Sequence, residues 1–268
     1  MQDSIGDRMK GYEEQFRSFS VPRIPLIIRL DGRAFHSFTC GLERPFSQSF
    51  HNLMVATTKR LVSETDALLG YTQSDEISLL LYTHSHRSQL WFGGNIQKIV
   101  SISAALATAF FNANLKHHLP IKADTSLPLF DSRAFNISRE DTPNYFLWRE
   151  QDATRNSISM AAQAVFSHSQ LQGISCSRMQ DMLMERGINW NDYPSCQKRG
   201  TYIQRKLVNT TFSIEELSEL PPKHAAHKNP HLVFERHRIL ELELPIFSKI
   251  VNKDSFIFDG VTAEIAVE

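Results

Sequence analysis

The chain has 268 residues, of which 41% are hydrophobic and 22% charged, a composition typical of a globular protein with one large or two small domains. The 29 basic residues balance the 29 acidic ones, so the net charge does not indicate a nucleic-acid binder. A local basic surface is still compatible with this balance. Three widely separated cysteines argue against a disulfide framework, and no apolar run approaches the roughly 20 residues that span a bilayer.

The first half of the chain predicts alternating strands and helices. A short helix is expected from about residue 4 to 19, and Ile24–Leu30 predicts a buried strand. Ser47–Ser63 has the apolar spacing of a helix. The stretch ALLGYTQSDEISLLLY predicts a β-hairpin with acidic residues at its tip. Asn95–His117 follows the i, i+3, i+4 pattern of an amphipathic helix.

The second half is less regular. LPLFDSRAFNIS contains a predicted strand, and Asp152–His168 and Ser177–Arg186 are predicted helices. Ser213 and Glu216 have the spacing of a capping box that opens a short helix. His231–Pro245 alternates like a strand, but arginines interrupt its apolar face, so one long strand and two short strands are both open.

The order β-α-ββ-α-β of these elements predicts an α+β fold, in which helices pack on one face of an antiparallel-rich sheet. A smaller appendage of helices and strands is expected to follow. We therefore divide the chain into a catalytic core at 1–140 and a C-terminal part at 141–268 that packs on the core.

Two acidic residues of the predicted core suggest a metal site. Asp31 comes at the end of a strand, before a turn at Gly32, and Asp75 lies at the hairpin tip. In a βαββ unit these elements are neighbours, and two close carboxylates repel one another unless a cation joins them. Carboxylate oxygens favour Mg²⁺ bridged to substrate phosphates, and two such ions assist phosphoryl transfer. The alternative is that Asp31 and Gly32 form an ordinary turn and that Asp75 lies on a solvated hairpin tip. The occurrence of both acids on neighbouring elements favours a metal site.

Basic residues are predicted near the same edge of the sheet. Arg29, Arg33, Arg44 and Lys98 would supply positive charge for phosphates, since arginine binds phosphate with two hydrogen bonds and lysine acts as a point charge. Each of them alone also fits a solvated surface cation. His36 fits a packed histidine equally well.

The segments RLDGRAFHSF, GYTQSDEISLLL, FDSRAF and WREQDATRNSI, in this order, resemble the tRNA-His guanylyltransferase family over residues 4–206. This resemblance implies a fold similar to the palm of polymerases and nucleotide cyclases. It implies an enzyme that adds nucleotides to the 5′ end of tRNA in the 3′-to-5′ direction. The 5′ phosphate would be activated with ATP or GTP, and the 3′-hydroxyl of an incoming nucleoside triphosphate would then attack it.

The resemblance also implies the residues of the site. Asp31 and Asp75 would bind two Mg²⁺ ions together with the Gly32 carbonyl, and Glu76 would complete the catalytic acidic motif. The triphosphate nucleotide, ATP or GTP, would be bound by the following residues: Arg29, Asp31, Gly32, Arg33, Ala34, Phe35, His36, Arg44, Ser74, Asp75 and Lys98.

One departure from the family pattern points to a branch. Eukaryotic members carry a His-Ile-Asn-Asn-Leu-Tyr-Asn stretch where this chain has Thr154–Met160, which keeps little more than Asn156. In this respect the chain resembles the bacterial and archaeal guanylyltransferase-like members. Resemblance to that branch implies template-dependent addition of nucleotides opposite a complementary base, as in the repair of truncated tRNA 5′ ends.

Contacts to tRNA are expected from basic residues in the C-terminal part. Lys198, Arg199 and Arg205 belong to the densest basic cluster of the chain, for which a solvated loop is the alternative. Arg155 and Asn156 are predicted to begin a helix whose N-terminal amides hold a phosphate. The family resemblance further implies a homotetramer, and the free thiols indicate a cytoplasmic protein.

Two rival functions remain open. A palm-type nucleotide cyclase would use the same acidic pair but would need no RNA. A tRNA-binding protein that has lost catalysis would not need the acidic pair at all, and the presence of Asp31, Asp75 and Glu76 argues against it.

Overall fold

The protein is represented by a computed structural model that describes residues 4–123, 127–229 and 231–266. Its centre is a six-stranded sheet with the order β4-β1-β3-β2-β5-β6, in which each neighbouring pair is antiparallel. The strands are β1 (Leu26–Arg33), β2 (Leu69–Gln73), β3 (Glu76–Leu81), β4 (Leu129–Asn136), β5 (Thr201–Thr210) and β6 (Phe234–Leu242). The predicted α+β class with an antiparallel sheet is confirmed.

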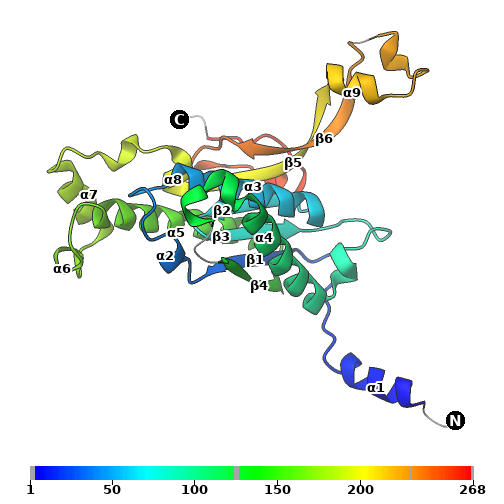
Figure 1. The fold of residues 1–268 in the computed structure, drawn as a ribbon, viewed down its shortest axis with the longest axis horizontal. Helices are drawn as coiled ribbons and strands as arrows, with labels where there is room; N and C mark the ends of the chain where they lie inside the picture. Colours follow the sequence, from blue (N-terminus) through cyan, green and yellow to red (C-terminus); the bar gives the residue numbers. More distant parts are fainter. Residues whose placement is uncertain (1–3, 124–126, 230, 267–268) are drawn as a thin grey trace.

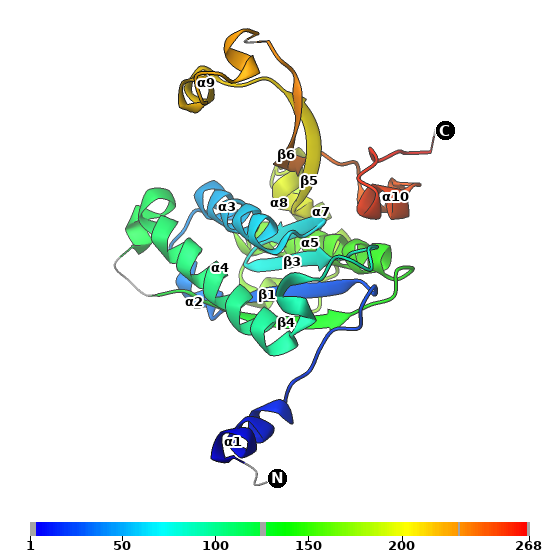
Figure 2. The same cartoon turned by 90° about the vertical axis from the view of Figure 1, so that its right-hand side faces the viewer.

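Two long helices cover one face of the sheet (Figure 2). They are α3 (Gln48–Thr65) and α4 (Ile96–His118), and the N-caps of both accept a backbone hydrogen bond, Ser47 for α3 and Asn95 for α4. Alternate residues of β1, among them Leu26 and Ile28, are fully buried in the core cluster that these helices share with the sheet.

The opposite face is covered by α5 (Thr142–Gln163) and α10 (Lys253–Phe258), which share a second core cluster with the sheet. The expectation of helices on only one face is therefore wrong. The reason lies in the central strands: Ile27 of β1 and Leu80 of β3 are as fully buried as their neighbours on the other face. A strand that is apolar on both sides needs cover on both sides.

Shorter elements complete the chain: α1 (Ile5–Glu14), α2 (Phe35–Phe38), α6 (His168–Leu171), α7 (Cys176–Met184), α8 (Ser195–Arg199), α9 (Ile214–Glu219), and the 3-10 turns η1 (Trp91–Gly94), η2 (Pro120–Lys122), η3 (Trp190–Asp192), η4 (Ala225–His227) and η5 (Phe247–Lys249). In both ribbon views α1 stands away from the sheet, and the outer halves of β5 and β6 form an arm with α9 at its end (Figures 1 and 2).

The C-terminal half differs most from the sequence prediction. Helix α5 begins at Thr142, ten residues before the predicted Asp152, because Pro143 suits the first turn of a helix. Strand β5 has no counterpart among the predicted elements, because its inner residues are buried on both faces and do not show the alternation of a half-buried strand. Phe234–Leu242 forms one strand and not two. The division near residue 140 remains a prediction, and β5 and β6 belong to the same sheet as the N-terminal strands.

Strand β1 also continues further than predicted. Asp31, Gly32 and Arg33 lie inside it and pair with β4, so Gly32 is not a turn residue. The turn comes at Ala34, which has a left-handed backbone (φ 58°) and leads into α2. Glycine is needed at position 32 for a different reason: a Cβ there would overlap the ring of Phe35.

Helix α4 bears on the expectation that no segment is apolar and long enough to span a bilayer. Among the described residues it is the one helix long and apolar enough, by length and composition alone, to cross a bilayer. Its buried residues Ile99, Ser103, Ala107, Phe111 and Leu115 recur at helical spacing and belong to the face against the sheet. This is the arrangement of an amphipathic helix on a protein core.

The Gly32 contact predicts a stability effect. Gly32→Ala should lower the free energy of unfolding by about 1 to 3 kcal/mol, because the new methyl group overlaps the buried Phe35 ring. Urea denaturation followed by circular dichroism measures this. Gly11→Ala is the matched control, since a Cβ at Gly11 meets nothing within 4 Å. Equal stabilities of the Gly32→Ala variant and wild type would contradict the packing argument.

Candidate active site

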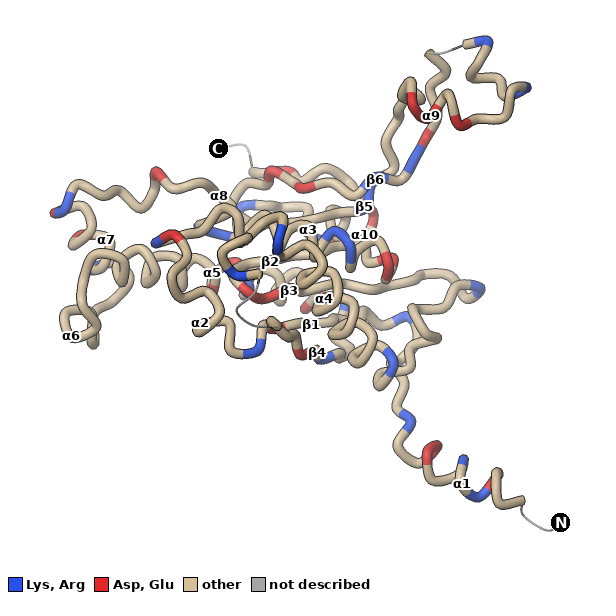
Figure 3. The backbone as a smooth tube through the Cα atoms, viewed as in Figure 1, with Lys and Arg blue, Asp and Glu red and all other residues tan. Residues whose placement is uncertain are grey.

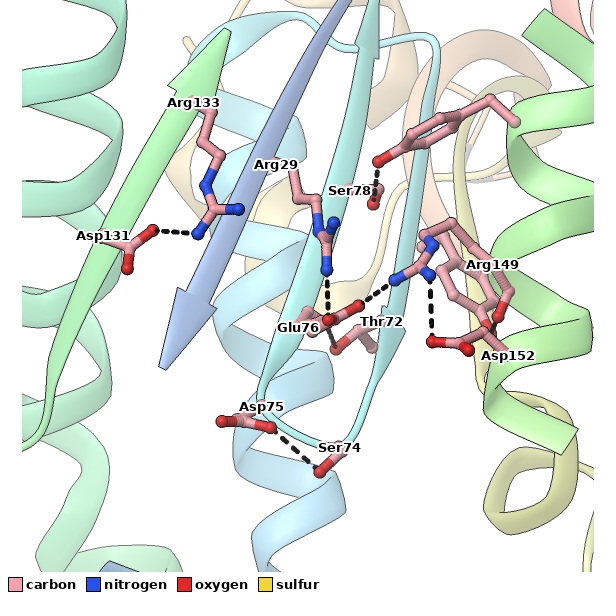
Figure 4. Close-up of polar contacts among 12 residues, drawn as sticks. Arg29, Thr72, Ser74, Asp75, Glu76, Ser78, Asp131, Arg133, Arg149 and Asp152 are labelled. Carbon is pink, nitrogen blue, oxygen red and sulfur yellow. Dashed lines mark hydrogen bonds and ion pairs between the residues drawn. The ribbon is translucent and has the colours of Figure 1, made fainter. Parts of the chain in front are cut away.

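The hairpin tip brings the two predicted acids together. Ser74 adopts a left-handed backbone (φ 52°), and with Asp75 it closes a two-residue turn between β2 and β3. The backbone amide of Gly32 donates a hydrogen bond to the carbonyl of Asp75 (3.2 Å), which joins the tip to β1. Asp31 lies directly opposite Glu76 across the β1–β3 pair. Asp31, Asp75 and Glu76 therefore gather at one end of the β1–β3 pair, and Figure 4 shows Asp75 and Glu76 of this group.

The carboxylates of Asp31 and Asp75 are partly buried, and the pKa values of both are raised, although Arg29 and Arg133 act in the opposite direction on Asp31. Burial, with repulsion from Glu76 and Asp131, raises the pKa of Asp31 above its usual value. Burial, with the charge of Asp31 as a further cause, raises the pKa of Asp75 to about 6. Within the described part of the chain, neither carboxylate forms an ion pair with a lysine or arginine.

Glu76 has a different environment from the other two acids. One of its carboxylate oxygens forms an ion pair with Arg29 of β1, and the other with Arg149 of α5 (Figure 4). The side chain of Arg149 is only 4% exposed, and it also binds Asp152 at 3.0 Å. Glu76 is thus a clamp that links the sheet to α5, and both of its oxygens are engaged.

Sequence reasoning missed two parts of this site. Arg149 was seen only as part of the WRE segment, and no local signal shows that it pairs with Glu76, 73 residues away. Asp131 of β4 lies directly opposite Asp31, and its carboxylate pairs with Arg133 at 3.2 Å. The FDSRAF segment contains both residues, and the predicted strand there was the available signal.

The donor set has the character of a site for a hard cation. The described residues contain no group of three or more His, Cys, Asp or Glu side chains that could hold a metal ion. Two partly buried carboxylates with raised pKa values nevertheless suit an ion that takes its remaining ligands from phosphates and water. The residues therefore fit Mg²⁺ bound together with a phosphorylated substrate.

A cavity of about 440 Å³ opens beside the hairpin tip. It lies between the loop after α2, the start of α3, the end of α5, and α8. Of the predicted nucleotide-binding residues, it is lined by Phe35, His36, Arg44, Ser74 and Asp75. Its remaining lining contains hydrogen-bonding and apolar side chains, among them His51, Gln163, Gln197 and Met160. The volume falls within the range of small-ligand sites.

Phe35 has a structural role as well. Its ring is almost fully buried and packs at centroid distances of 5.0 to 6.0 Å against Phe38, Phe50, Phe111 and Phe130. This aromatic cluster anchors α2, so the exposed His36 is carried by a helix that is fixed to the core.

Other predicted nucleotide-binding residues lie outside the cavity lining. Arg29 is engaged with Glu76, and Arg33 is exposed at the last position of β1. Lys98 lies in the first turn of α4, where Asn95 bridges to Phe19 in the segment that leads into β1. The start of α4, which carries Lys98, therefore lies beside the segment that precedes β1, whereas Asp31 lies near the other end of that strand.

The structure separates the predicted basic cluster. Lys198 is buried and donates to the carbonyl of Asn191, and Arg199 stays near the cavity on α8. Arg205 pairs with Asp66 further along β5. Lysines and arginines also alternate with acidic residues along the β5–β6 arm (Figure 3). The alternative of a loop is wrong, because these residues belong to a helix and a strand.

The prediction that Arg155 and Asn156 begin a helix is also wrong. Both lie in the middle of α5, where the backbone amides are already hydrogen-bonded within the helix and no N-terminal phosphate site exists. Arg155 pairs with Asp152 at 2.8 Å and remains 55% exposed. Its guanidinium is therefore still accessible, although its place in the fold is different.

Comparisons with known proteins show which family the chain is similar to. A family model described as tRNA(His) guanylyltransferase matches residues 6–138. The chain is 31% identical to the tRNA(His) guanylyltransferase of Schizosaccharomyces pombe over 224 residues, covering 78% of this chain and 83% of that protein. It is similar to the solved structure of a bacterial tRNA(His) guanylyltransferase-like protein in complex with ATP (TM-score 0.77, 39% identity, 95% of this chain and 99% of the other covered). A GTP complex of such a bacterial protein matches with a TM-score of 0.70 and 36% identity over 95% of this chain and 97% of the other.

The raised pKa of Asp75 predicts a pH-dependent stability difference. Between pH 4 and 6 the folded protein binds the Asp75 proton more tightly than the unfolded chain, so stability falls as the pH rises through this window. In buffer with a chelator, Asp75→Asn should be more stable than wild type at pH 7.5, by about 2 kcal/mol, and equally stable near pH 4. Urea denaturation at both pH values measures this. Asp181→Asn, at an exposed position of α7, is the control.

The clamp at Glu76 predicts a large loss of stability when one of its arginines is removed. Arg149→Met should lower the free energy of unfolding by about 3 to 5 kcal/mol, because Glu76 then loses its buried partner. The double variant with Glu76→Gln should cost less than the sum of the two single variants. Arg155→Met, which removes only an exposed ion pair, should cost less than about 1 kcal/mol. Additive costs of the two clamp variants would show that the residues do not act together.

Proposed function

Because the chain belongs to the tRNA(His) guanylyltransferase family, we propose that it is a nucleotidyltransferase that adds nucleotides to the 5′ end of tRNA in the 3′-to-5′ direction, opposite a complementary template base. The observation that carries this proposal is the position of Asp75, which both lines the cavity and lies beside Asp31. The similarity to a bacterial guanylyltransferase-like protein over 95% of the chain supports the template-dependent branch.

The reaction has two steps that use the same carboxylates. A 5′-monophosphate oxygen of the tRNA attacks the α-phosphorus of ATP or GTP, which releases pyrophosphate and leaves a 5′-nucleotidylylated RNA. The 3′-hydroxyl of an incoming nucleoside triphosphate then attacks the 5′-phosphorus of the RNA and releases the activating nucleotide as a monophosphate. The cavity holds the nucleotide, with Ser74 and His36 at its wall and Arg44 positioned to balance the triphosphate charge.

We propose Mg²⁺ as the cofactor. Asp31, Asp75 and the carbonyl of Gly32 would hold two ions, which would supply charge neutralisation for the phosphates and a lower pKa for the attacking hydroxyl. The chain's own contribution is to keep both carboxylates free of arginine partners. Glu76 accomplishes part of this, because it engages Arg29, which lies two residues before Asp31 in β1.

A homotetramer in the cytoplasm is the assembly and location that we propose. Helix α1 stands away from its own core with Ile5, Met9 and Tyr12 exposed, which supports contact with a second copy. All three cysteines are free thiols, which supports a reducing compartment. Contacts to tRNA remain proposed for the exposed cations Arg155 and Arg205 and for the partly exposed Arg199.

A single incubation tests the function. Wild-type protein with 5′-truncated tRNA, ATP, Mg²⁺ and labelled nucleoside triphosphates should extend the RNA at its 5′ end, and a chelator should stop the reaction. Asp31→Asn and Asp75→Asn should each slow extension by roughly a thousandfold or more. Asp181→Asn should leave the rate unchanged.

Three results would contradict parts of the proposal. A cyclic nucleotide formed from the triphosphate without RNA would identify a cyclase. RNA binding without extension or cyclisation would identify an inactive tRNA-binding protein. Wild-type rates in either carboxylate variant would rule out the acidic pair as the catalytic centre.

A further inference from the structure

Trp148 is an exposed aromatic side chain beside the catalytic carboxylates. It lies on α5 and is 45% exposed, although its neighbours Tyr145, Phe146 and Arg149 are buried. Exposure of so large an apolar ring costs free energy that burial would regain, and such rings commonly mark binding surfaces. The function proposed above assigns no role to this ring.

Two arginines and a tyrosine hold the ring of Trp148 in place. The guanidinium of Arg149 lies 3.6 Å from the ring centroid, and that of Arg29 lies 5.8 Å from it. Tyr145 packs against its edge at 5.8 Å between centroids. Because both arginines are also bound to Glu76, the clamp fixes the ring as well as the carboxylate. A rigid, partly exposed aromatic surface is well suited to stacking.

The position of Trp148 relative to the cavity is informative. Along α5, Tyr145 contacts Ser78, Arg149 contacts Glu76, and Met160 lines the cavity. Trp148 therefore lies on the side of the carboxylates away from the cavity. A nucleotide in the cavity and a second group on Trp148 would meet at Asp31 and Asp75 from opposite sides.

The surface next to Trp148 suits a nucleic acid better than an apolar protein face. On β4, the exposed side chains alternate as Leu129, Asp131, Arg133 and Phe135, and Arg133 lies directly opposite Arg29 in the β1–β4 pair. Arg29 is paired with Glu76, whereas Arg133 pairs with Asp131 at the surface and remains 55% exposed, so Arg133 can contact a phosphate while the tryptophan stacks on a base.

From these contacts we propose that Trp148 is the platform on which the terminal base of the tRNA 5′ end stacks, with Arg133 near its backbone. The inference rests on the proposed function, because it identifies where the RNA substrate of that reaction binds. Trp148 is a positioning residue: it would align the 5′ phosphate with the carboxylates while the triphosphate occupies the cavity.

Intrinsic fluorescence of the full chain tests this proposal. The protein has three tryptophans, and stacking of a base on Trp148 should quench its emission when 5′-truncated tRNA is added without nucleotides. Trp148→Phe should lose the quenching and keep most of the affinity. Trp148→Ala should bind the RNA about tenfold more weakly and bind ATP as wild type does. Trp91→Phe, on η1, is the matched control and should retain the quenching.

The outcomes separate this inference from the proposed function. If wild type extends tRNA and Trp148→Ala binds and extends it equally well, the platform is wrong and the function stands. If Trp148 is quenched by RNA but wild type extends nothing, the function is wrong and the platform stands. Quenching that follows protein concentration and not RNA would assign Trp148 to a contact between copies of the chain and would overturn the proposal. The Trp148→Phe titration decides the question even if the alanine variant does not fold.

Discussion

The ion-pair clamp at Glu76 is the interaction on which the site depends. It joins β1, β3 and α5, three elements that come from distant parts of the chain. Its two arginines are partly or fully buried, and Glu76 compensates the charge of both, with Asp152 as a second partner of Arg149, so the clamp is costly to break. The same clamp removes Arg29 from competition for Asp31. One network thus stabilises the packing of α5 on the sheet and keeps the neighbouring carboxylates available.

Helix α5 contributes residues to both sides of the site. Its first half carries Trp148 and Arg149, and its last turns reach the cavity through Met160 and Gln163. The carboxylates of β1 and of the hairpin tip lie between these two regions. A single rigid helix therefore sets the spacing between the two sides of the site, which a pair of flexible loops would not do.

The sequence predicted those features that depend on local pattern. The hairpin with Asp75 at its tip and the helices α3 and α4 follow from periodicity and turn residues, and the pairing of Asp31 with that tip follows from chain order. Pairings between distant residues were not predictable in this way. Arg149 finds Glu76 across 73 residues, and Lys198 is buried by contacts with Trp190 and Asn191 that no local rule anticipates. Charge in a sequence shows that a partner is needed but does not show which one.

The arm formed by β5 and β6 affects the cooperativity of unfolding. Near the sheet, Tyr202 pairs on both sides, with β2 and with β6, whereas beyond Gln204 the two strands pair only with each other. A two-stranded ribbon without a sheet neighbour has little stability of its own. Amide protons in the outer part of the arm should therefore exchange by local opening, at a free energy well below that of global unfolding. Asp31 and Glu76 belong to β1 and β3, which have a neighbouring strand on each side, so fraying of the arm should leave their arrangement intact.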